Sequence, residues 1–289
     1  MYRHGVHRWI VLAAVLAACS SSPSESGQGD ALPVTTGTGS GPTVSSAPTV
    51  TTSTEPIAVP GAELVGRWAH YDIVAYEDNT LKTLIVSYGF NDFTVEDGEL
   101  VDQGSFCFSE QRTDQPIATS LSDAATQAIR PPPTPVDVAT TDGTLTVLRP
   151  ATPTPVGIRL DDAANEPLPT DPDDPRIVDD DGDGKPGITV TIQVGDELTG
   201  ELYIARREIF SYVASVVAPD RLEGTVTDNS EQLVIGASDP IFLADSNWQQ
   251  HPDPAKSPII LIRVDDTWDC ERLATERDDL FPPTPDVDW

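Results

Sequence analysis

The sequence predicts a mainly β protein, an antiparallel β-barrel or sandwich with one or two short helices. Three observations predict this fold class. Short runs rich in β-branched and aromatic residues recur about ten times after residue 60. Turn-forming residues separate these runs every ~8–15 residues. Residues 188–194 alternate apolar and polar side chains without a break, which is the pattern of a half-buried strand.

Residues 1–18 have the layout of an export signal. Arg3 and Arg8 are basic, and the apolar run after them is too short to span a bilayer. The run ends in Leu-Ala-Ala before Cys19, which resembles the lipobox of bacterial lipoproteins. This resemblance implies cleavage before Cys19, acyl chains on that cysteine and a stable membrane anchor. The alternative is an ordinary signal peptide, or a buried N-terminal helix, with an incidental cysteine.

Residues 19–60 consist mostly of Ser, Thr, Pro and Gly, and they lack the apolar periodicity that a core requires. We expect a disordered tether between the lipid anchor and the folded part. Ser20, in place of an aspartate, follows the cysteine, which favours the outer membrane or cell surface if the host is Gram-negative. The whole layout resembles bacterial lipoproteins that join a lipobox, a tether and a β domain, and this resemblance implies location and architecture but no activity.

The β domain is expected over residues 61–281, and hairpin signals dominate its first half. Asp-Gly pairs between apolar runs are typical of tight hairpin turns, and Ser122 is a typical helix N-cap. The expected elements are strands over 64–76 and 81–88, a hairpin over 93–108 with its turn at Asp97-Gly98, a helix over 122–129 ended by Pro131, a hairpin over 136–149 with its turn at Asp142-Gly143, and a strand over 155–160.

A Pro- and Asp-rich loop over 161–187 divides these elements from a second group of strands. The second group comprises strands over 188–194, 200–217, 222–226, 232–235, 241–243 and 259–264, a short helix over 267–277, and a Pro-rich tail over 282–289. A chain of this length can bury its own core as one domain. Two subdomains, one on each side of the loop, are the alternative.

Two cysteines are left once Cys19 carries lipid, namely Cys107 and Cys270. In an exported protein both meet an oxidising compartment, so we predict that they form a disulfide. A bridge that closes a loop of about 160 residues contributes up to ~4–5 kcal/mol in the chain-entropy model. Two separate buried thiols are the alternative.

The sharpest chemical motif is an acidic loop with carboxylates at Asp179, Asp181 and Asp183. Alternate side chains at this spacing turn towards one point, and hard cations prefer such oxygen ligands. We expect a weak structural calcium site with the three carboxylates and the Lys185 carbonyl as ligands. The alternative is a solvated acidic turn without an ion.

The acidic loop matches two calcium patterns only in part. It resembles the first half of an EF-hand loop, but Val190 stands where the closing glutamate belongs. It also resembles the calcium loops of β-propeller and integrin-type repeats, although Gly187 replaces their last carboxylate. Candidates to complete the shell are Glu197, Glu201, Asp171, Asp173 and Asp174. An incomplete shell implies a dissociation constant of ~0.1–1 mM and a role in fastening the loop.

The first expected strand contains Gly66-Arg67-Trp68, which resembles the Gly-x-Trp motif of lipocalins and related calycin barrels. In that family an arginine from a late strand packs on the tryptophan, and Arg263 or Arg206 is in place to do so. The resemblance implies a barrel with an internal ligand. The motif is short, so the alternative is a tryptophan packed in any β core.

The composition excludes some functions. The net charge is −30, with 47 acidic and 17 basic residues, so the basic surface that nucleic acids require is absent. No catalytic sequence motif is present, and His70 and His251 lack the spacing of zinc ligands. Acidic pairs such as Asp265-Asp266 are common by chance in so acidic a chain. We therefore expect no enzyme.

Three functional hypotheses follow. The first is a non-enzymatic envelope lipoprotein that binds an unknown protein or small molecule, or supports the envelope, with calcium holding its acidic loop. The second is a calycin-like carrier of a small apolar ligand, which requires a deep apolar cavity beside Trp68; a solid core there would argue against it. The third is a hydrolase, which requires a cleft with converging carboxylates of perturbed pKa.

Overall fold

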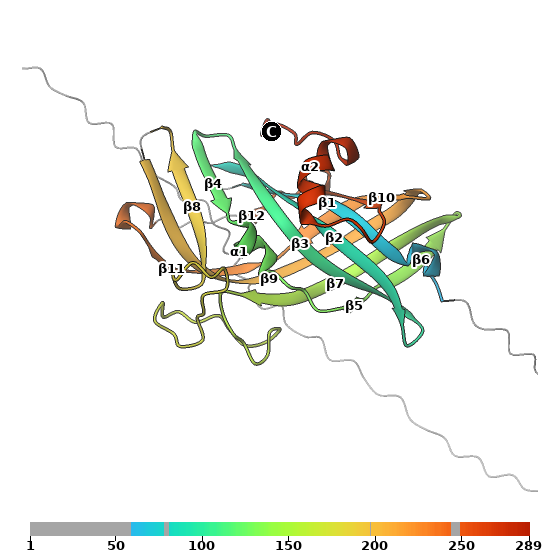
Figure 1. Cartoon of the computed structure of the whole chain (residues 1–289), viewed down its shortest axis with the longest axis horizontal. Helices are drawn as coiled ribbons and strands as arrows, with labels where there is room; N and C mark the ends of the chain where they lie inside the picture. Colours follow the sequence, from blue (N-terminus) through green and yellow to red (C-terminus); the bar gives the residue numbers. More distant parts are fainter. Residues whose placement is uncertain (1–58, 78–80, 197, 244–248) are drawn as a thin grey trace, which may run out of the picture. The chain divides into compact units, whose positions relative to one another are not determined.

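In the computed structural model, residues 59–77, 81–196, 198–243 and 249–289 are described, and they form one antiparallel sheet of 13 strands (Figure 1). The sheet curls into a half-barrel, which confirms the mainly β prediction. Because every strand joins the same sheet, the two strand groups do not form separate subdomains. Residues 1–18, Cys19 and the tether as far as residue 58 lie outside the described residues.

The strands have the following bounds in chain order: β1 (Gly66–Glu77), β2 (Lys82–Glu96), β3 (Glu99–Thr113), β4 (Ile117–Leu121), β5 (Thr134–Pro135), β6 (Asp137–Thr141), β7 (Thr144–Val156), β8 (Ile188–Val194), β9 (Leu198–Ala218), β10 (Arg221–Asp228), β11 (Glu231–Ala237), β12 (Gln249–Gln250) and β13 (Pro258–Arg263). The helices are η1 (Ala62–Leu64), α1 (Asp123–Gln127), η2 (Pro240–Phe242), η3 (Pro254–Lys256) and α2 (Cys270–Leu280). The longest path through the sheet runs β4-β8-β9-β10-β13-β1-β2-β3-β5.

The hairpin turns lie where the sequence predicts them. Asp97 and Asp142 both adopt φ 51°, and the glycine after each also has a positive φ, as a two-residue hairpin turn requires. β2 is one continuous strand, although the sequence suggested two shorter ones. The separate strand expected over 155–160 is wrong, because β7 simply continues as far as Val156.

The strand expected over 241–243 is also wrong. These residues belong to the 3₁₀ turn η2 and the position after it, because the Asp239 side chain accepts a hydrogen bond from the Ile241 N–H at 2.9 Å and Pro240 begins the turn. A capping aspartate followed by proline is a helix-start signal, and here it prevails over the apolar character of the three residues.

β9 organises the sheet because it pairs with four other strands. Its first half pairs with β8 and β11, and its second half pairs with β7 and β10. β7 and β8 therefore follow one another along the same edge of β9, and the acidic loop leaves the sheet between them. Gly187 enters this junction with φ 79°, and a Cβ there would lie 2.2 Å from the Ile204 carbonyl oxygen, so only glycine fits.

The two α-helices pack on different faces of the sheet. α1, capped by Ser122, packs Ala125 against apolar side chains of β8 and β9 and also contacts β3. The terminal helix was expected over 267–277, and α2 lies at Cys270–Leu280 with Asp269 as its N-cap. Leu273 of α2 packs against the apolar residues on the outer face of β1, β2 and β3.

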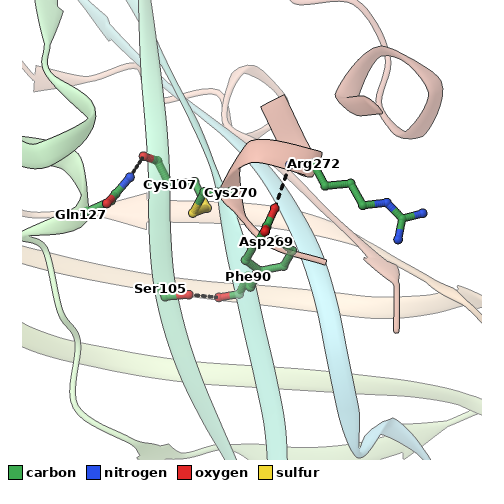
Figure 2. Close-up of a disulfide and its surroundings, with 7 residues drawn as sticks. All are labelled: Phe90, Ser105, Cys107, Gln127, Asp269, Cys270 and Arg272. Carbon is green, nitrogen blue, oxygen red and sulfur yellow. Dashed lines mark hydrogen bonds between the residues drawn. A yellow bond between two sulfur atoms is a disulfide. The ribbon is translucent and has the colours of Figure 1, made fainter. Parts of the chain in front are cut away.

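A disulfide joins Cys107 of β3 to Cys270 at the start of α2, as predicted (Figure 2). Gln127 of α1 donates a hydrogen bond to the Cys107 carbonyl at 3.1 Å, and Asp269 accepts one from the Arg272 N–H at 2.9 Å. The bridge fixes the start of α2 against the sheet.

Candidate functional site

The inner face of β1 lines a cavity within the half-barrel. Side chains alternate along a strand, so Asp72, Val74 and Tyr76 share the face that carries Trp68. All three line the cavity. Tyr71, on the opposite face of β1, packs outward against α2 and the residues that follow it.

The cavity has an empty volume of about 980 Å³, open solvent at its mouth included. Its walls are mostly apolar and come from several strands and from the residues after α1: Ile85, Phe106, Ile129, Val190, Ile204 and Phe210. A concave, mostly apolar site that also carries polar groups is typical of small-molecule binding sites.

The carboxyl groups of the cavity come from three strands of the sheet. Asp72 lies on β1, Asp228 on β10, and Glu208 on β9 together with Arg206. The Arg206 guanidinium donates to Glu208 at 3.2 Å and lies 3.8 Å from the Asp228 carboxylate. Tyr76 donates a hydrogen bond to Asp228. Three carboxyl groups and one guanidinium therefore meet on one wall of a cavity whose accessible surface is mostly apolar.

Asp72 has fewer hydrogen-bond partners than the other two carboxyl groups. It is only 1% exposed, and its Oδ1 has no hydrogen-bond partner. Burial, and then the negative charges of Asp228 and Glu208, raise the pKa of Asp72 well above its ordinary value. Burial also raises the pKa of Asp228 to about 6. Perturbed carboxyl groups in a cavity mark a candidate functional site.

A second set of buried polar side chains, around Asp102, forms its hydrogen bonds among its own members. Asp102 accepts hydrogen bonds from Asn91 at 2.8 Å and from Tyr212 at 2.9 Å, and the Arg149 Nε lies 3.2 Å from it. His70 shares a hydrogen bond of 2.9 Å with Asn91. Burial lowers the pKa of His70 to about 4, so this imidazole is neutral at pH 7. The group is a structural network, since its carboxylate already has its partners.

Trp68 packs in the core at η1, and Arg263 is the arginine that covers it. The Arg263 guanidinium lies 4.3 Å from the Trp68 ring centre and donates to the carbonyls of Val65 at 2.8 Å and Glu63 at 2.6 Å. The Trp68 indole N–H donates to the Leu64 carbonyl at 2.8 Å. The ring is completely buried and does not line the cavity. The expectation of a cavity directly beside Trp68 is therefore wrong: the core is solid there, and the cavity begins at Asp72 on the same face of β1.

The acidic loop brings its three predicted carboxylates together. One oxygen each from Asp179, Asp181 and Asp183 lies within 4.8 Å of the others. Asp179 also accepts the Gly182 N–H at 2.7 Å, and Asp181 accepts the Thr189 N–H at 2.9 Å through Oδ2. The Oδ1 of Asp181 is buried without a hydrogen-bond partner. Burial, together with the neighbouring carboxylates, raises the pKa of Asp181. An all-oxygen set with one unused acceptor fits a hard cation.

The described carboxylates proposed to complete the shell lie elsewhere, while the Lys185 carbonyl stays a predicted ligand. The Lys185 ammonium lies 3.4 Å from Asp183 and 2.7 Å from Glu201, so Glu201 is engaged by a lysine. Asp174 binds Arg176 at 2.9 Å. Among the described residues, neither Glu201 nor Asp174 joins the carboxylate cluster, and neither do Asp171 and Asp173. Glu197 lies outside the described residues.

Asp180 attaches the acidic loop to the end of β7. Its Oδ2 accepts the Gly157 N–H at 2.7 Å and an Arg159 N–H at 2.8 Å. Arg207 of β9 holds an earlier part of the loop segment. It donates to the Glu166 carbonyl at 2.6 Å and forms an ion pair with Glu231 of β11. Arg206 and Arg207 thus point to opposite faces of β9, as strand alternation predicts.

Comparison with protein-family models, with curated proteins and with solved structures yields no match. Within the described ranges, no helix is both long enough and apolar enough to cross a membrane. The function is therefore inferred from the geometry of the chain itself.

Sequence reasoning missed the carboxyl groups of the cavity. A signal for one of them was present, because Asp72 stands four residues after Trp68 and strand alternation gives both the same face. Glu208 and Asp228 carry no such signal, since their approach to Asp72 depends on how β9 and β10 curl around β1 through β13.

Proposed function

We propose that the protein is a membrane-anchored envelope lipoprotein whose β domain binds a small, largely apolar ligand inside the half-barrel. The cavity carries this proposal, because its accessible surface is mostly apolar and its carboxyl groups gather on one wall. The lipobox-like segment ending at Cys19 supports the anchor, and the 40 or so residues after it would hold the cavity away from the bilayer by roughly 35 Å.

The solid core around Trp68 argues against the calycin form of the carrier hypothesis, although one contact of that resemblance is present. Arg263 from β13 stacks on the tryptophan of the first strand and ties η1 to the sheet through two carbonyls. This is the contact that the resemblance to calycin barrels implies. It closes the sheet near Trp68 and leaves the interior further along β1 for a ligand.

The binding proposal is tested with a neutral, apolar fluorescent probe, N-phenyl-1-naphthylamine. We expect saturable binding to the wild-type protein with one probe per chain. Ile85→Trp fills the cavity from β2 and should weaken binding at least about tenfold, which corresponds to ~1.4 kcal/mol. Ile129→Trp fills it from the other wall and should act in the same way.

Val217→Trp is the matched control, because Val217 is 55% exposed on β9 and does not line the cavity. This variant should bind the probe like the wild type. Circular dichroism checks that all variants are folded. Equal binding by the folded cavity variants and the wild type would refute an internal site.

We further propose that the acidic loop holds a weakly bound calcium ion through Asp179, Asp181 and Asp183. The unused Oδ1 of Asp181 is the observation that supports an ion. The Lys185 ammonium would compete with the calcium ion for the Asp183 carboxylate, which agrees with weak calcium binding. Because the loop joins β7 to β8, an ion there would stiffen this junction.

A hydrolase is the second candidate function, because carboxyl groups of raised pKa do converge in the cavity. A neutral Asp72 is suited to act as a general acid. The apolar walls argue against a carbohydrate substrate. Turnover of fluorogenic esters or glycosides that is present in the wild type and lost in Asp72→Asn would favour this candidate over the carrier.

A further inference from the structure

The carboxyl groups of the cavity outnumber the basic groups that face them. Glu208 has Arg206 as its partner at 3.2 Å, and the Ser230 hydroxyl donates to it at 2.8 Å. Asp228 has the Tyr76 hydroxyl and the Ser230 N–H, the latter at 3.1 Å. Arg149 also lines the cavity, but its charge is matched by Asp102.

Asp72 has no cationic partner of this kind. Among the described residues, the basic group in ion-pair range is His70, whose Nε2 lies 3.7 Å from Oδ1 and has no hydrogen-bond partner itself. Burial keeps this imidazole neutral. Leaving a buried carboxyl oxygen unpaired destabilises the folded state. A ligand group that paired with Asp72 would recover this free energy.

We propose that the ligand of the cavity is an amphipathic amine, with its ammonium group against Asp72 and its hydrocarbon body against the apolar walls. This inference rests on the proposed carrier function and specifies its ligand class. The body would contact side chains such as Ile85, Phe106 and Phe210. Asp228 and Glu208, on the neighbouring strands, would add to the attraction for a cation.

An anionic ligand does not fit the same wall. The two guanidinium groups at the cavity, Arg206 and Arg149, already face Glu208 and Asp102. A ligand carboxylate would therefore bring a further negative charge beside Asp72 and Asp228 without gaining a free cation. A neutral alcohol would satisfy Asp72 by a hydrogen bond, but it would leave the negative charge of the wall uncompensated.

Release of a proton on binding would identify an ion pair between the ligand ammonium and the Asp72 carboxylate. Burial and the charges of Asp228 and Glu208 raise the pKa of Asp72, so the free protein holds a proton there. An ammonium ion next to the carboxyl group favours its ionised form, so binding of the amine should release this proton to the buffer. Asp228, Glu208, His70 and Arg206 are the titratable and charged groups that face Asp72.

The test compares n-decylamine, n-decanol and n-decanoate by titration calorimetry with the full-length protein at 150 mM salt, each below its micelle concentration. We expect the wild type to bind decylamine at least about tenfold more tightly than decanol, and decanoate most weakly. Titrations in two buffers of different ionisation enthalpy should show proton release with the amine alone. This comparison needs no variant.

Asp72→Asn should reduce the preference for the amine over the alcohol to about threefold or less and abolish the proton release, while decanol still binds. Asp278→Asn is the control for general attraction by the acidic chain, because it removes one charge from a side chain that is 98% exposed. It should behave as the wild type.

The outcomes separate the two proposals. Equal affinity for amine and alcohol, or tighter binding of decanoate, overturns the amine proposal and leaves the carrier function standing. An amine preference that Asp278→Asn reduces as much as Asp72→Asn does also overturns it. Absence of binding by all three probes, together with failure of the neutral fluorescent probe, overturns the carrier function itself.

Discussion

Asp72 places an ionisable side chain in the middle of a β core, and the folded state resists its ionisation. The folded protein keeps the proton on this carboxyl group, whereas the unfolded chain loses it at about the ordinary pKa of 3.8. Between that value and the raised pKa, the unfolded state binds fewer protons than the folded state. The free energy of unfolding contributed by Asp72 therefore falls as the pH rises through this range.

Asp72→Asn should remove this cost, because an amide has nearly the same shape and does not ionise. We expect the melting temperature at pH 8 to rise by ~2–4 °C for each kcal/mol of this cost in a domain of this size. Near pH 3, where both states of the wild type hold the proton, the difference should nearly vanish. Thermal melts of both proteins from pH 3 to 8 measure it.

The difference in melting temperature between Asp72→Asn and the wild type reports the titration of Asp72, because its titratable neighbours are present in both proteins. Asp228, with a pKa raised to about 6, and His70, with a pKa lowered to about 4, titrate in both proteins. Their effects oppose one another, because the folded state favours the neutral form of each. A melting difference that does not change with pH would mean that Asp72 does not titrate abnormally.

Individual residues were predictable where the chemistry is local. Ser122 caps α1, and the Asp-Gly turns have the expected backbone, because these effects depend on residues a few positions apart. The disulfide between Cys107 and Cys270 was predictable by a different route, namely the small number of cysteines and the expected compartment. The raised pKa of Asp72 was not predictable, since it depends first on burial by the assembled sheet and then on carboxyl groups on β9 and β10.

Among the structural elements, the acidic loop yields the most direct prediction. At 1 mM calcium and a dissociation constant of ~0.1 mM, binding would stabilise the folded state by ~1.4 kcal/mol. We therefore expect the melting temperature to rise by ~3–6 °C when chelator is replaced by 1 mM calcium. Differential scanning calorimetry measures this shift.

Asp181→Asn should abolish the calcium shift, because it removes the carboxylate that carries the unused oxygen. Asp196→Asn is its matched control, since Asp196 is an exposed residue in the turn between β8 and β9, outside the loop. This control should keep the full shift. No shift in the wild type at millimolar calcium would remove the calcium proposal.

Strands were predictable in proportion to their length and their local turns. β1, β2, β8 and β9 contain long β-rich runs, and the sequence places each of them. The short strands β4 and β5 were missed, because five and two residues show too little periodicity. The acidic loop was correctly placed between two strand groups, but its site at a junction on one edge of β9 follows from pairing alone.

For the whole molecule, the anchor is the testable property. If the chain is lipidated at Cys19, the wild type expressed in a bacterial host with lipoprotein processing should partition into the membrane or detergent phase. Cys19→Ser should shift it to the aqueous phase, since no acyl chain would then hold it. Ser20→Ala should remain anchored as the control. A wild type found wholly in the aqueous phase would contradict the anchor.

The fold class was predictable from the β-rich runs, whereas the choice between barrel and sandwich was not. That choice depends on which distant strands meet, and the decisive contact is the pairing of β1 with β13. Trp68 and Arg263 are partners in this pairing. The Gly-x-Trp motif hinted at their contact, but a motif of three residues does not define a sheet.

The pairing of β1 with β13 joins strands that lie far apart in the chain. The first long strand of the domain finds its place between β2 and a strand that lies almost 200 residues later in the chain, since Trp68 aligns with Arg263. Contacts of such high sequence separation slow folding. A chain that emerges N-terminus first therefore exposes one edge of β1 until its last strand appears, and the cavity cannot close before then. Pausing the nascent chain just before residue 258 would leave every wall strand synthesised, with the sheet still open.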